Sequence, residues 1–140
     1  MAGQVLEFPD AVEAWVGYLA PRLDPPVGGE RRDADAFVRV LRTGGVRQTK
    51  ITDNAQVTFE CYARYDDDAA RLASHARSHV LAAAGSRLSP AAFCKSITEV
   101  SGPAEMPDPD TELSRYSFTV LTALKATVAA PEQLRGTPAA

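Results

Sequence analysis

His75 and His79 are the only histidines in the chain, and their spacing is the one that metal-binding helices use. Residues i and i+4 lie on one face of an α-helix, so the two imidazoles would point the same way. The segment between them holds Arg77 and lacks the glutamate of the metalloprotease motif, and no third ligand stands at a matching spacing. Two interpretations stay open: a small metal-dependent enzyme that uses both histidines, and a helix flank at the edge of the core or in a subunit contact, which we favour.

The other candidate sites lack the context that their chemistry needs. Gly44-Gly45 is followed by no lysine at phosphate-loop spacing and by no helix whose amides could hold an anion, so we predict a hairpin bend or a bulge. Three consecutive carboxylates, Asp66 to Asp68, cannot all face one cation and suit the first turn of a helix. No serine lies in a Gly-x-Ser-x-Gly elbow. We therefore predict no catalytic, cofactor-binding or metal-binding residues and no enzymatic activity.

The two cysteines, Cys61 and Cys94, are the remaining residues whose side chains could be reactive. They lie in or beside strand-like patterns, without CxxC spacing and without further cysteines to build a metal site or a disulfide framework. We predict that both are buried apolar fillers.

The length and composition suit one domain. A chain of 140 residues with 45% hydrophobic content can form a single core. We predict one domain over residues 1–128, followed by a mobile tail over residues 129–140. No apolar run reaches the ~18 to 20 residues of a membrane-spanning helix, and the first residues lack the features of a secretion signal. We expect a protein that stays in the cytosol where it is made and has no membrane partner.

The charges of the chain are segregated, although the net charge is only −3. Residues 42–50 hold Arg42, Arg47 and Lys50 and no acid, whereas residues 99–112 hold five acids and no base. A dedicated nucleic-acid binder would carry a basic excess, and no aromatic side chain lies between Arg42 and Asn54 to stack on bases. We predict two surfaces of opposite sign, with a nucleic-acid-binding module as a lesser alternative.

These segments lie within a pattern of two helices and four strands. The first helix should begin at Pro9 and Asp10 and end near Ala20. Its apolar stripe consists of Val12, Trp15, Val16 and Leu19. Residues 24–33, rich in proline, glycine and charge, are typical of a connecting loop.

Alternating apolar and polar residues predict strands over residues 37–41 and 56–63. The connection between them, residues 43–54, is longer than the ~2 to 5 residues of ordinary hairpin loops, and such connections are usually functional or disordered. We predict a long projecting β-hairpin, whose length suits ordering on contact with a neighbour, while its order in the free monomer stays open.

A second helix should follow from Asp66 and stop at Gly85. Its mostly small apolar stripe is Ala69, Leu72, Ala73, Ala76, Val80 and Ala83. Strands over residues 93–100 and 115–127 complete the order helix, strand, strand, helix, strand, strand. We predict an α+β fold in which two helices pack on one face of a four-stranded, mainly antiparallel sheet. The other face should meet water or a partner, because it carries Thr58, Glu60 and Tyr62 from one strand and Ser117, Thr119 and Leu121 from another.

Five short segments, in this order and spacing, carry a family resemblance. They are FPDAVEA (8–14), FVRVLRTGG (37–45), AQVTFECYA (55–63), GPAEMPDPD (102–110) and RYSFTV (115–120). Together they resemble tail terminator proteins of long-tailed (siphovirus-type) bacteriophages of actinobacteria, over residues 5–127.

The resemblance implies a structural virion protein. Proteins of that family form a hexameric ring that caps the tail tube at full length, stops its polymerisation and offers the surface for head-tail joining. The implied partners are further copies of the chain, the tail tube protein and a head-tail connector protein, while DNA passes through the ring lumen without specific recognition. The implied location is the head-proximal end of the tail in the virion, and the host cytoplasm during assembly. The alternative within this class is another head-tail connector or minor tail component.

A closed ring needs two different patches on each subunit that fit each other head to tail. We predict that the basic hairpin of one subunit meets acidic groups of its neighbour, while strand edges add main-chain pairing. The hairpin residues are Arg42, Gly44, Gly45, Arg47 and Lys50, and the acidic residues are Glu105, Asp108 and Asp110. Exposed ion pairs contribute only ~0 to 1 kcal/mol each, so they would set the orientation while apolar and backbone contacts hold the ring.

Overall fold

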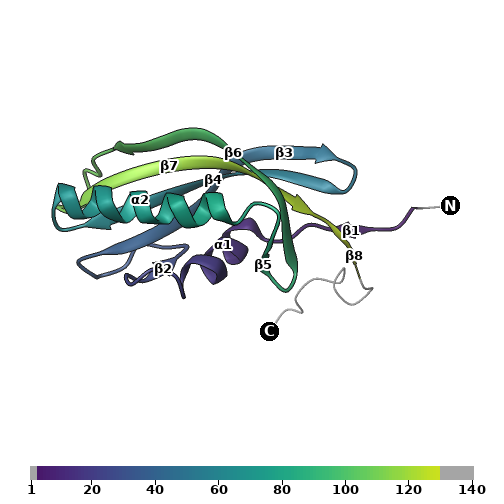
Figure 1. Cartoon of the computed structure of the whole chain (residues 1–140), viewed down its shortest axis with the longest axis horizontal. Helices are drawn as coiled ribbons and strands as arrows, with labels where there is room; N and C mark the ends of the chain where they lie inside the picture. Colours follow the sequence, from purple (N-terminus) through teal and green to yellow (C-terminus); the bar gives the residue numbers. More distant parts are fainter. Residues whose placement is uncertain (1–2, 130–140) are drawn as a thin grey trace.

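Two helices and two β-sheets make up the described part of the chain, residues 3–129 (Figure 1). The helices of this computed structural model are α1 (Ala11–Leu19) and α2 (Asp66–Ala82). The strands are β1 (Leu6–Glu7), β2 (Val27–Gly28), β3 (Phe37–Thr49), β4 (Thr52–Ala63), β5 (Arg87–Ser89), β6 (Ala92–Glu105), β7 (Ser114–Lys125) and β8 (Thr127–Val128). One sheet has the order β2-β3-β4-β7-β6-β5, and the other joins β1 to β8.

The prediction of a four-stranded, mainly antiparallel sheet is wrong, because two short strands extend the main sheet to six and make it mixed. The four predicted strands are β3, β4, β7 and β6, which pair antiparallel in that order. At one edge β2 pairs parallel with β3, and at the other β5 pairs antiparallel with β6. The added strands are two and three residues long, too short to show a period-2 pattern. The fold is still α+β, and β2 lies within the segment that we predicted to be a loop.

The first helix has the predicted boundaries but a wider buried stripe. Asp10 caps it, since one carboxylate oxygen accepts the backbone N–H of Glu13 over 3.1 Å. The buried residues of α1 are Ala11, Ala14, Trp15, Tyr18 and Leu19. Tyr18 belongs to the buried set, and its hydroxyl is satisfied because it donates to the backbone carbonyl of His79 in α2 over 3.1 Å. Val12 and Val16, which we placed on the stripe, are half-buried at its margin.

The prediction for the second helix is confirmed. All six residues of its predicted stripe are buried, and the three aspartates lie in its first turn, where their charge suits the positive end of the helix dipole. Gly85 follows the last turn with a φ of 80°, a conformation that glycine adopts without steric cost. Small side chains along α2 let its backbone lie close to the sheet.

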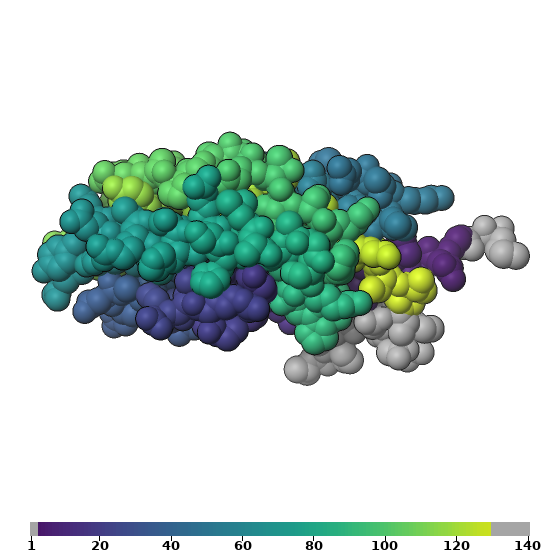
Figure 2. All heavy atoms as spheres, in the orientation of Figure 1, coloured from purple at the N-terminus to yellow at the C-terminus, as the bar shows by residue number. Residues whose placement is uncertain are grey.

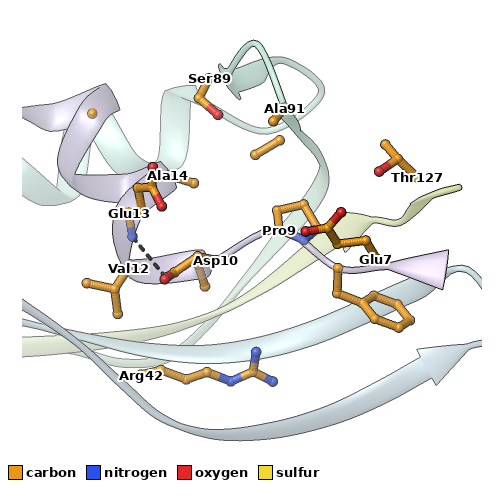
Figure 3. Close-up of a pocket in the computed structure, with 14 residues that line it drawn as sticks. Glu7, Pro9, Asp10, Val12, Glu13, Ala14, Arg42, Ser89, Ala91 and Thr127 are labelled. Carbon is orange, nitrogen blue, oxygen red and sulfur yellow. Dashed lines mark hydrogen bonds between the residues drawn. The ribbon is translucent and has the colours of Figure 1, made fainter. Parts of the chain in front are cut away.

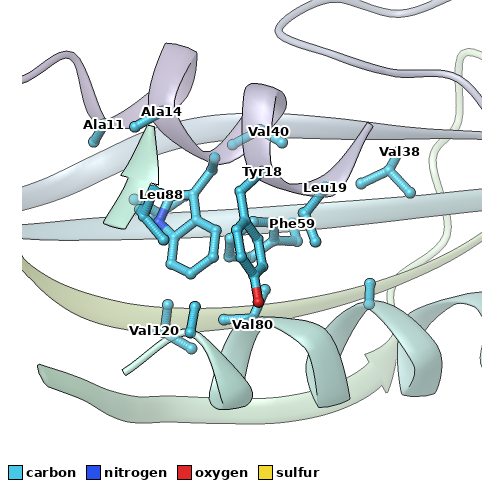
Figure 4. Packing of buried hydrophobic residues seen from close by; sticks show 14 of the residues in the cluster. Ala11, Ala14, Tyr18, Leu19, Val38, Val40, Phe59, Val80, Leu88 and Val120 are labelled. Atoms are coloured by element: carbon cyan, nitrogen blue, oxygen red, sulfur yellow. The ribbon is translucent and has the colours of Figure 1, made fainter. Parts of the chain in front are cut away.

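The core lies between both helices and one face of the sheet (Figure 4). The Trp15 ring meets Phe59 edge-on with 5.4 Å between centroids, and Phe59 stacks on Phe118 at 4.8 Å. Trp15 Nε1 donates to Thr122 Oγ1 over 3.1 Å, so the one polar atom of the buried indole is satisfied. Cys61 and Cys94 are fully buried, as predicted, and burial raises their thiol pKa values to about 12 and about 11. Both thiols therefore stay protonated near neutral pH and are poor nucleophiles.

The connection predicted at residues 43–54 is almost entirely strand. Only Lys50 and Ile51 form the turn between β3 and β4. The first residues of β4 are held on their other side by β7, where Thr52 pairs with Lys125. The hairpin is therefore an extended corner of the sheet instead of a free loop, and Figure 2 shows it in blue at one end of the molecule.

The sheet face opposite the helices, which we call the open face, differs from the prediction at two positions. Thr58, Glu60, Thr119 and Leu121 are half-exposed, but Tyr62 and Ser117 are buried. Phe37 stacks on the Tyr62 ring at 4.4 Å, and Asp108 of the β6–β7 connection accepts a hydrogen bond from its hydroxyl. The connection thus covers one end of this face.

The two ends of the described chain lie together. Leu6 of β1 pairs with Val128 of β8, and the backbone N–H of Ala129 donates to the carbonyl of Val5 over 3.0 Å. The tail predicted for residues 129–140 lies outside the described residues apart from Ala129. Neither helix in residues 3–129 has the length and apolar character needed to cross a bilayer.

Candidate functional site

The basic hairpin predicted from sequence forms one corner of the sheet, and we call residues 42–55 the arm. Its outer strand is exposed from Arg42 to Lys50, with Val46 at 76% exposure. A register shift between Arg42 and Gly44 marks a β-bulge, as predicted for the glycine pair. Gly44 and Gly45 have φ values of 152° and 90°, and a Cβ on Gly45 would overlap the Asn54 carbonyl oxygen. The bulge in this strand therefore requires glycine at position 45.

Arg42, one of the predicted contact residues, is bound within its own arm. Its guanidinium donates to both carboxylate oxygens of Asp53, over 2.6 and 3.0 Å, and its Nε donates to the carbonyl of Gly44 over 3.1 Å. The hydrogen bond with Asp53 raises the pKa of Arg42 above its ordinary value. Asp53 is only 7% exposed, so this bidentate pair links the first residue of the arm to the buried start of β4.

The other two basic residues of the arm are available to a partner. Arg47 and Lys50 are exposed, and neither forms an ion pair with any carboxylate in residues 3–129. They lie near Ile51, which is 46% exposed at the turn. The end of the arm thus combines two unpaired cations with exposed apolar surface.

Asp108, predicted to meet a neighbouring subunit, is buried instead. It accepts hydrogen bonds from the Asp110 backbone N–H at 3.0 Å and from the Tyr62 hydroxyl at 2.9 Å. It also faces the guanidinium groups of Arg31 at 2.6 Å and Arg115 at 3.7 Å. The bond from Asp110 N–H is the largest cause that lowers the Asp108 pKa, followed by Tyr62 and the two arginines. Its carboxylate is therefore engaged within the subunit.

The remaining acidic candidates stay on the surface. Glu105 is exposed and forms no ion pair within residues 3–129, and Asp110 lies 3.5 Å from Arg31 with its side chain 72% exposed. Glu99, also acidic, faces α2, where Arg77 donates to its two oxygens over 2.5 and 3.0 Å. The Arg77 hydrogen bond is the main cause that lowers the Glu99 pKa. Glu99 and Glu105 both belong to β6, which lies towards the opposite edge of the sheet from the arm.

The two histidines lie on the outer part of α2. His75 is exposed and His79 is half-buried. Within residues 3–129 no group of three histidine, cysteine, aspartate or glutamate side chains is close enough to hold a metal ion. The metal interpretation of His75 and His79 gains no third ligand from the described fold.

A groove of about 700 Å³ lies beside the N-terminal end of α1 (Figure 3). Asp10 and Glu13 of α1, Arg42 of β3 and Thr127 of β8 line it, together with apolar residues. Two of its charged groups are already engaged, because Asp10 caps α1 and Arg42 binds Asp53. The groove is a junction between the arm, α1 and the β1–β8 sheet.

Two stretches of sheet edge have no strand partner among the described residues. On one side β2 pairs with β3 only at Val38 and Arg39, which leaves residues 42–49, the β3 edge, open. On the other side β5 reaches only to Phe93 of β6, which leaves residues 95–101, the β6 edge, open. Sequence periodicity located the strands, but it could not show which of their edges stay unpaired.

No pattern in the sequence predicted the cluster that holds Asp108. Arg31 lies in a segment that we took for a plain loop, and Arg115 lies on the sheet face that we expected to meet water. The available signal was Tyr62, a large aromatic residue on an otherwise polar strand face.

No protein family model matches the chain, and no curated protein matches it.

Proposed function

We propose that this chain is a structural virion protein, a tail terminator that assembles into a hexameric ring on the end of a long phage tail tube. The ring ends tube polymerisation and provides the surface to which the head attaches. The resemblance in residues 5–127 suggests this role. The observation that supports it best is the pair of open strand edges on opposite sides of one sheet.

Open edges on opposite sides of a subunit favour a repeating head-to-tail contact. Such a contact uses two different surfaces, and it closes into a ring when the rotation between copies divides a full turn. An unpaired strand edge is also a ready template for pairing with another chain. The arm, with Arg47 and Lys50, and the β6 side, with Glu105, add opposite charges to the two surfaces.

The proposed partners follow from this role. The ring contacts the tail tube protein on one rim and a head-tail connector protein on the other, and DNA passes through its lumen without sequence recognition. The protein is made in the host cytoplasm and ends in the virion at the head-proximal end of the tail. The proposal assigns it no catalytic residue and no cofactor.

Electron microscopy of the purified protein, alone and mixed with tail tubes, tests the proposal. We expect a six-fold annulus at one end of each tube. Because assembly of the ring can depend on the tube, a monomer in dilute solution fits the proposal, whereas a protein that never binds assembled tubes contradicts it.

A phage that lacks this protein separates a terminator from another head-tail connector. Loss of a terminator leaves tails of uncontrolled length, because nothing stops the tube from growing. Loss of a connector leaves tails of normal length that fail to join heads. Tails of normal length would therefore reject the terminator role and leave the connector role.

A further inference from the structure

The two open edges of the sheet have similar lengths and well-defined ends. The β3 edge begins beyond the pairing with β2 and ends at the Lys50–Ile51 turn. The β6 edge begins beyond the pairing with β5 and ends before Pro103, which has no N–H to donate to a neighbouring strand. Each edge therefore offers one short run of backbone groups, eight residues in β3 and seven in β6.

The strand directions make these two edges compatible. Each of the three pairings between β3 and β6, namely β3 with β4, β4 with β7 and β7 with β6, is antiparallel. Three reversals leave β3 and β6 running in opposite directions. When a second copy continues the sheet in the same orientation, its β6 lies antiparallel to β3 of the first copy, which is the more stable way for two strands to pair.

Side-chain positions select the register of this contact. Arg47 pairs with Asp53, which in turn pairs with the core residue Leu124, so Arg47 stands on the helix side of the sheet. Glu99 pairs with the core residue Val120 and stands on the same side. In an antiparallel pair, directly opposite residues share a face, so an arginine and a glutamate can face each other across the new contact.

The same register brings together two exposed valines. Val46 is 76% exposed and pairs with Asn54, on the open-face side of the sheet. Val100 is 51% exposed at the irregularity between Glu99 and Ser101. When Arg47 lies opposite Glu99 in an antiparallel ladder, Val46 lies opposite Val100. This one register therefore covers both exposed valines and places the cation of Arg47 next to the anion of Glu99.

We propose, on the basis of the ring-forming function above, that the β3 edge of one copy pairs antiparallel with the β6 edge of the next, with Arg47 opposite Glu99 and Val46 opposite Val100. Main-chain hydrogen bonds provide the affinity, and the side chains fix the register. Glu99 then keeps its ion pair with Arg77 of its own subunit and forms a second one with Arg47 of the neighbouring copy. The acidic partner of the arm is then Glu99 of β6, and the buried Asp108 has no part in the contact.

The proposed register staggers neighbouring copies along the strand direction. Within one copy, Val46 pairs with Asn54, Asn54 pairs with Ala123, and Ala123 pairs with Ser96, so Val46 and Ser96 lie at the same height along the strands. The contact with Val100 therefore displaces the next copy by four residues, about 13 Å at ~3.3 Å per residue. A closed sheet with such a stagger has strands inclined to its axis, as in β-barrels.

A pair of cysteines in the full chain tests the contact. The variant Val46→Cys, Val100→Cys places two thiols on directly opposite residues of the paired strands, within the distance that a disulfide spans. Cys61 and Cys94 are fully buried and do not compete. After mild oxidation, with and without tail tubes, we expect a ladder of covalent multimers that ends at the size of the ring.

Two matched controls define the result. Either single variant should stay monomeric on a non-reducing gel, because the contact joins two different edges, whereas a dimer from a single variant would show a two-fold contact and overturn the proposal. The pair Val46→Cys, Lys95→Cys shifts one thiol out of register and should give no ladder. An equal ladder from this pair would also overturn the register.

The failure of this inference differs from the failure of the proposed function. Rings at tube ends in electron micrographs of the wild-type protein, with no ladder from Val46→Cys, Val100→Cys under the same conditions, would reject the edge pairing and leave the function standing. A wild-type protein that neither forms rings nor binds tubes would reject both.

Discussion

The hydroxyl of Tyr62 donates a hydrogen bond of 2.9 Å to the carboxylate of Asp108, 46 residues further along the chain. The same carboxylate oxygen faces Arg31 at 2.6 Å and Arg115 at 3.7 Å. One buried acid therefore joins the β4 and β7 strands, the segment after β2 and the β6–β7 connection. This cluster closes one end of the open face and determines which acids remain for a partner.

Replacing Asp108 with asparagine should destabilise the fold. Asparagine keeps the size of the side chain, but it removes the charge that faces two guanidinium groups, of which Arg115 is only 16% exposed. We expect a loss of about 2 kcal/mol in the free energy of unfolding, measured by urea denaturation. Asp110→Asn is the matched control, and because its side chain is 72% exposed it should cost less than ~0.5 kcal/mol. Equal losses for the two variants would contradict the assigned role of Asp108.

The Asp108 cluster also predicts how stability depends on pH. Hydrogen bonds and arginines lower the pKa of Asp108 below its ordinary value of 3.8, so around that pH the unfolded chain binds more protons than the folded one. The contribution of Asp108 is complete above the unfolded pKa and is lost as the pH falls through the folded pKa. Urea midpoints measured from pH 6 to pH 2 should therefore drop below about pH 4, and Asp108→Asn should flatten this drop. An unchanged slope in the variant would show that other carboxylates carry the effect.

Local sequence signals predicted the helices well. The helix boundaries depend on Asp10 and Gly85, and the buried face of α2 depends on its stripe of small residues. These signals involve only residues within one or two helical turns, so the sequence alone contains them. The short strands β2 and β5 depend on an existing sheet edge and carry no signal of their own. The burial of Tyr62 depends on Asp108, and no periodicity in either strand indicates that contact.

The fold divides the predicted contact residues into engaged and exposed ones. Charge segregation predicted a basic hairpin, but it could not separate Arg42, which binds Asp53 eleven residues away, from Arg47, which has no ion-pair partner within residues 3–129. The acidic segment likewise contained one buried residue, Asp108, and exposed residues such as Glu105. Charge alone gives the sign of a surface, whereas the fold decides which of its residues are already engaged.

Gly45→Ala should distort the arm. Gly45 has a φ of 90°, and a Cβ there would overlap the Asn54 carbonyl oxygen and lie 2.6 Å from the Gln56 nitrogen. We expect a loss of about 2 to 3 kcal/mol in urea denaturation, together with faster hydrogen exchange in the arm amides. Gly85→Ala is the control, because Gly85 has a φ of 80° with open space around it, and its cost should stay near ~1 kcal/mol. A Gly45→Ala variant no less stable than Gly85→Ala would show that the bulge relaxes freely.

Arg42→Ala and Arg47→Ala should differ in their effect on stability. Loss of Arg42 leaves the carboxylate of Asp53 buried without a partner, and we expect a decrease of about 2 kcal/mol in the free energy of unfolding. Arg47 has no partner within residues 3–129, so its loss should change stability by less than ~0.5 kcal/mol. Urea denaturation measures both values. Similar losses would mean that Arg47 contributes to the fold of the subunit.

Reversing the free charges of the arm should weaken assembly without harming the fold. Arg47→Glu with Lys50→Glu replaces two exposed cations by anions, so the arm would repel the acidic β6 side of a neighbour. Exposed charges are screened by salt, and the deficit relative to the wild type should therefore be larger at low salt than at 0.5 M. Light scattering of the protein, alone and with tail tubes, measures the assembled mass. The control is Arg32→Glu with Arg64→Glu, an equal charge change at exposed residues outside both edges. If both double variants assemble alike, net charge explains the effect and the arm is not the contact surface.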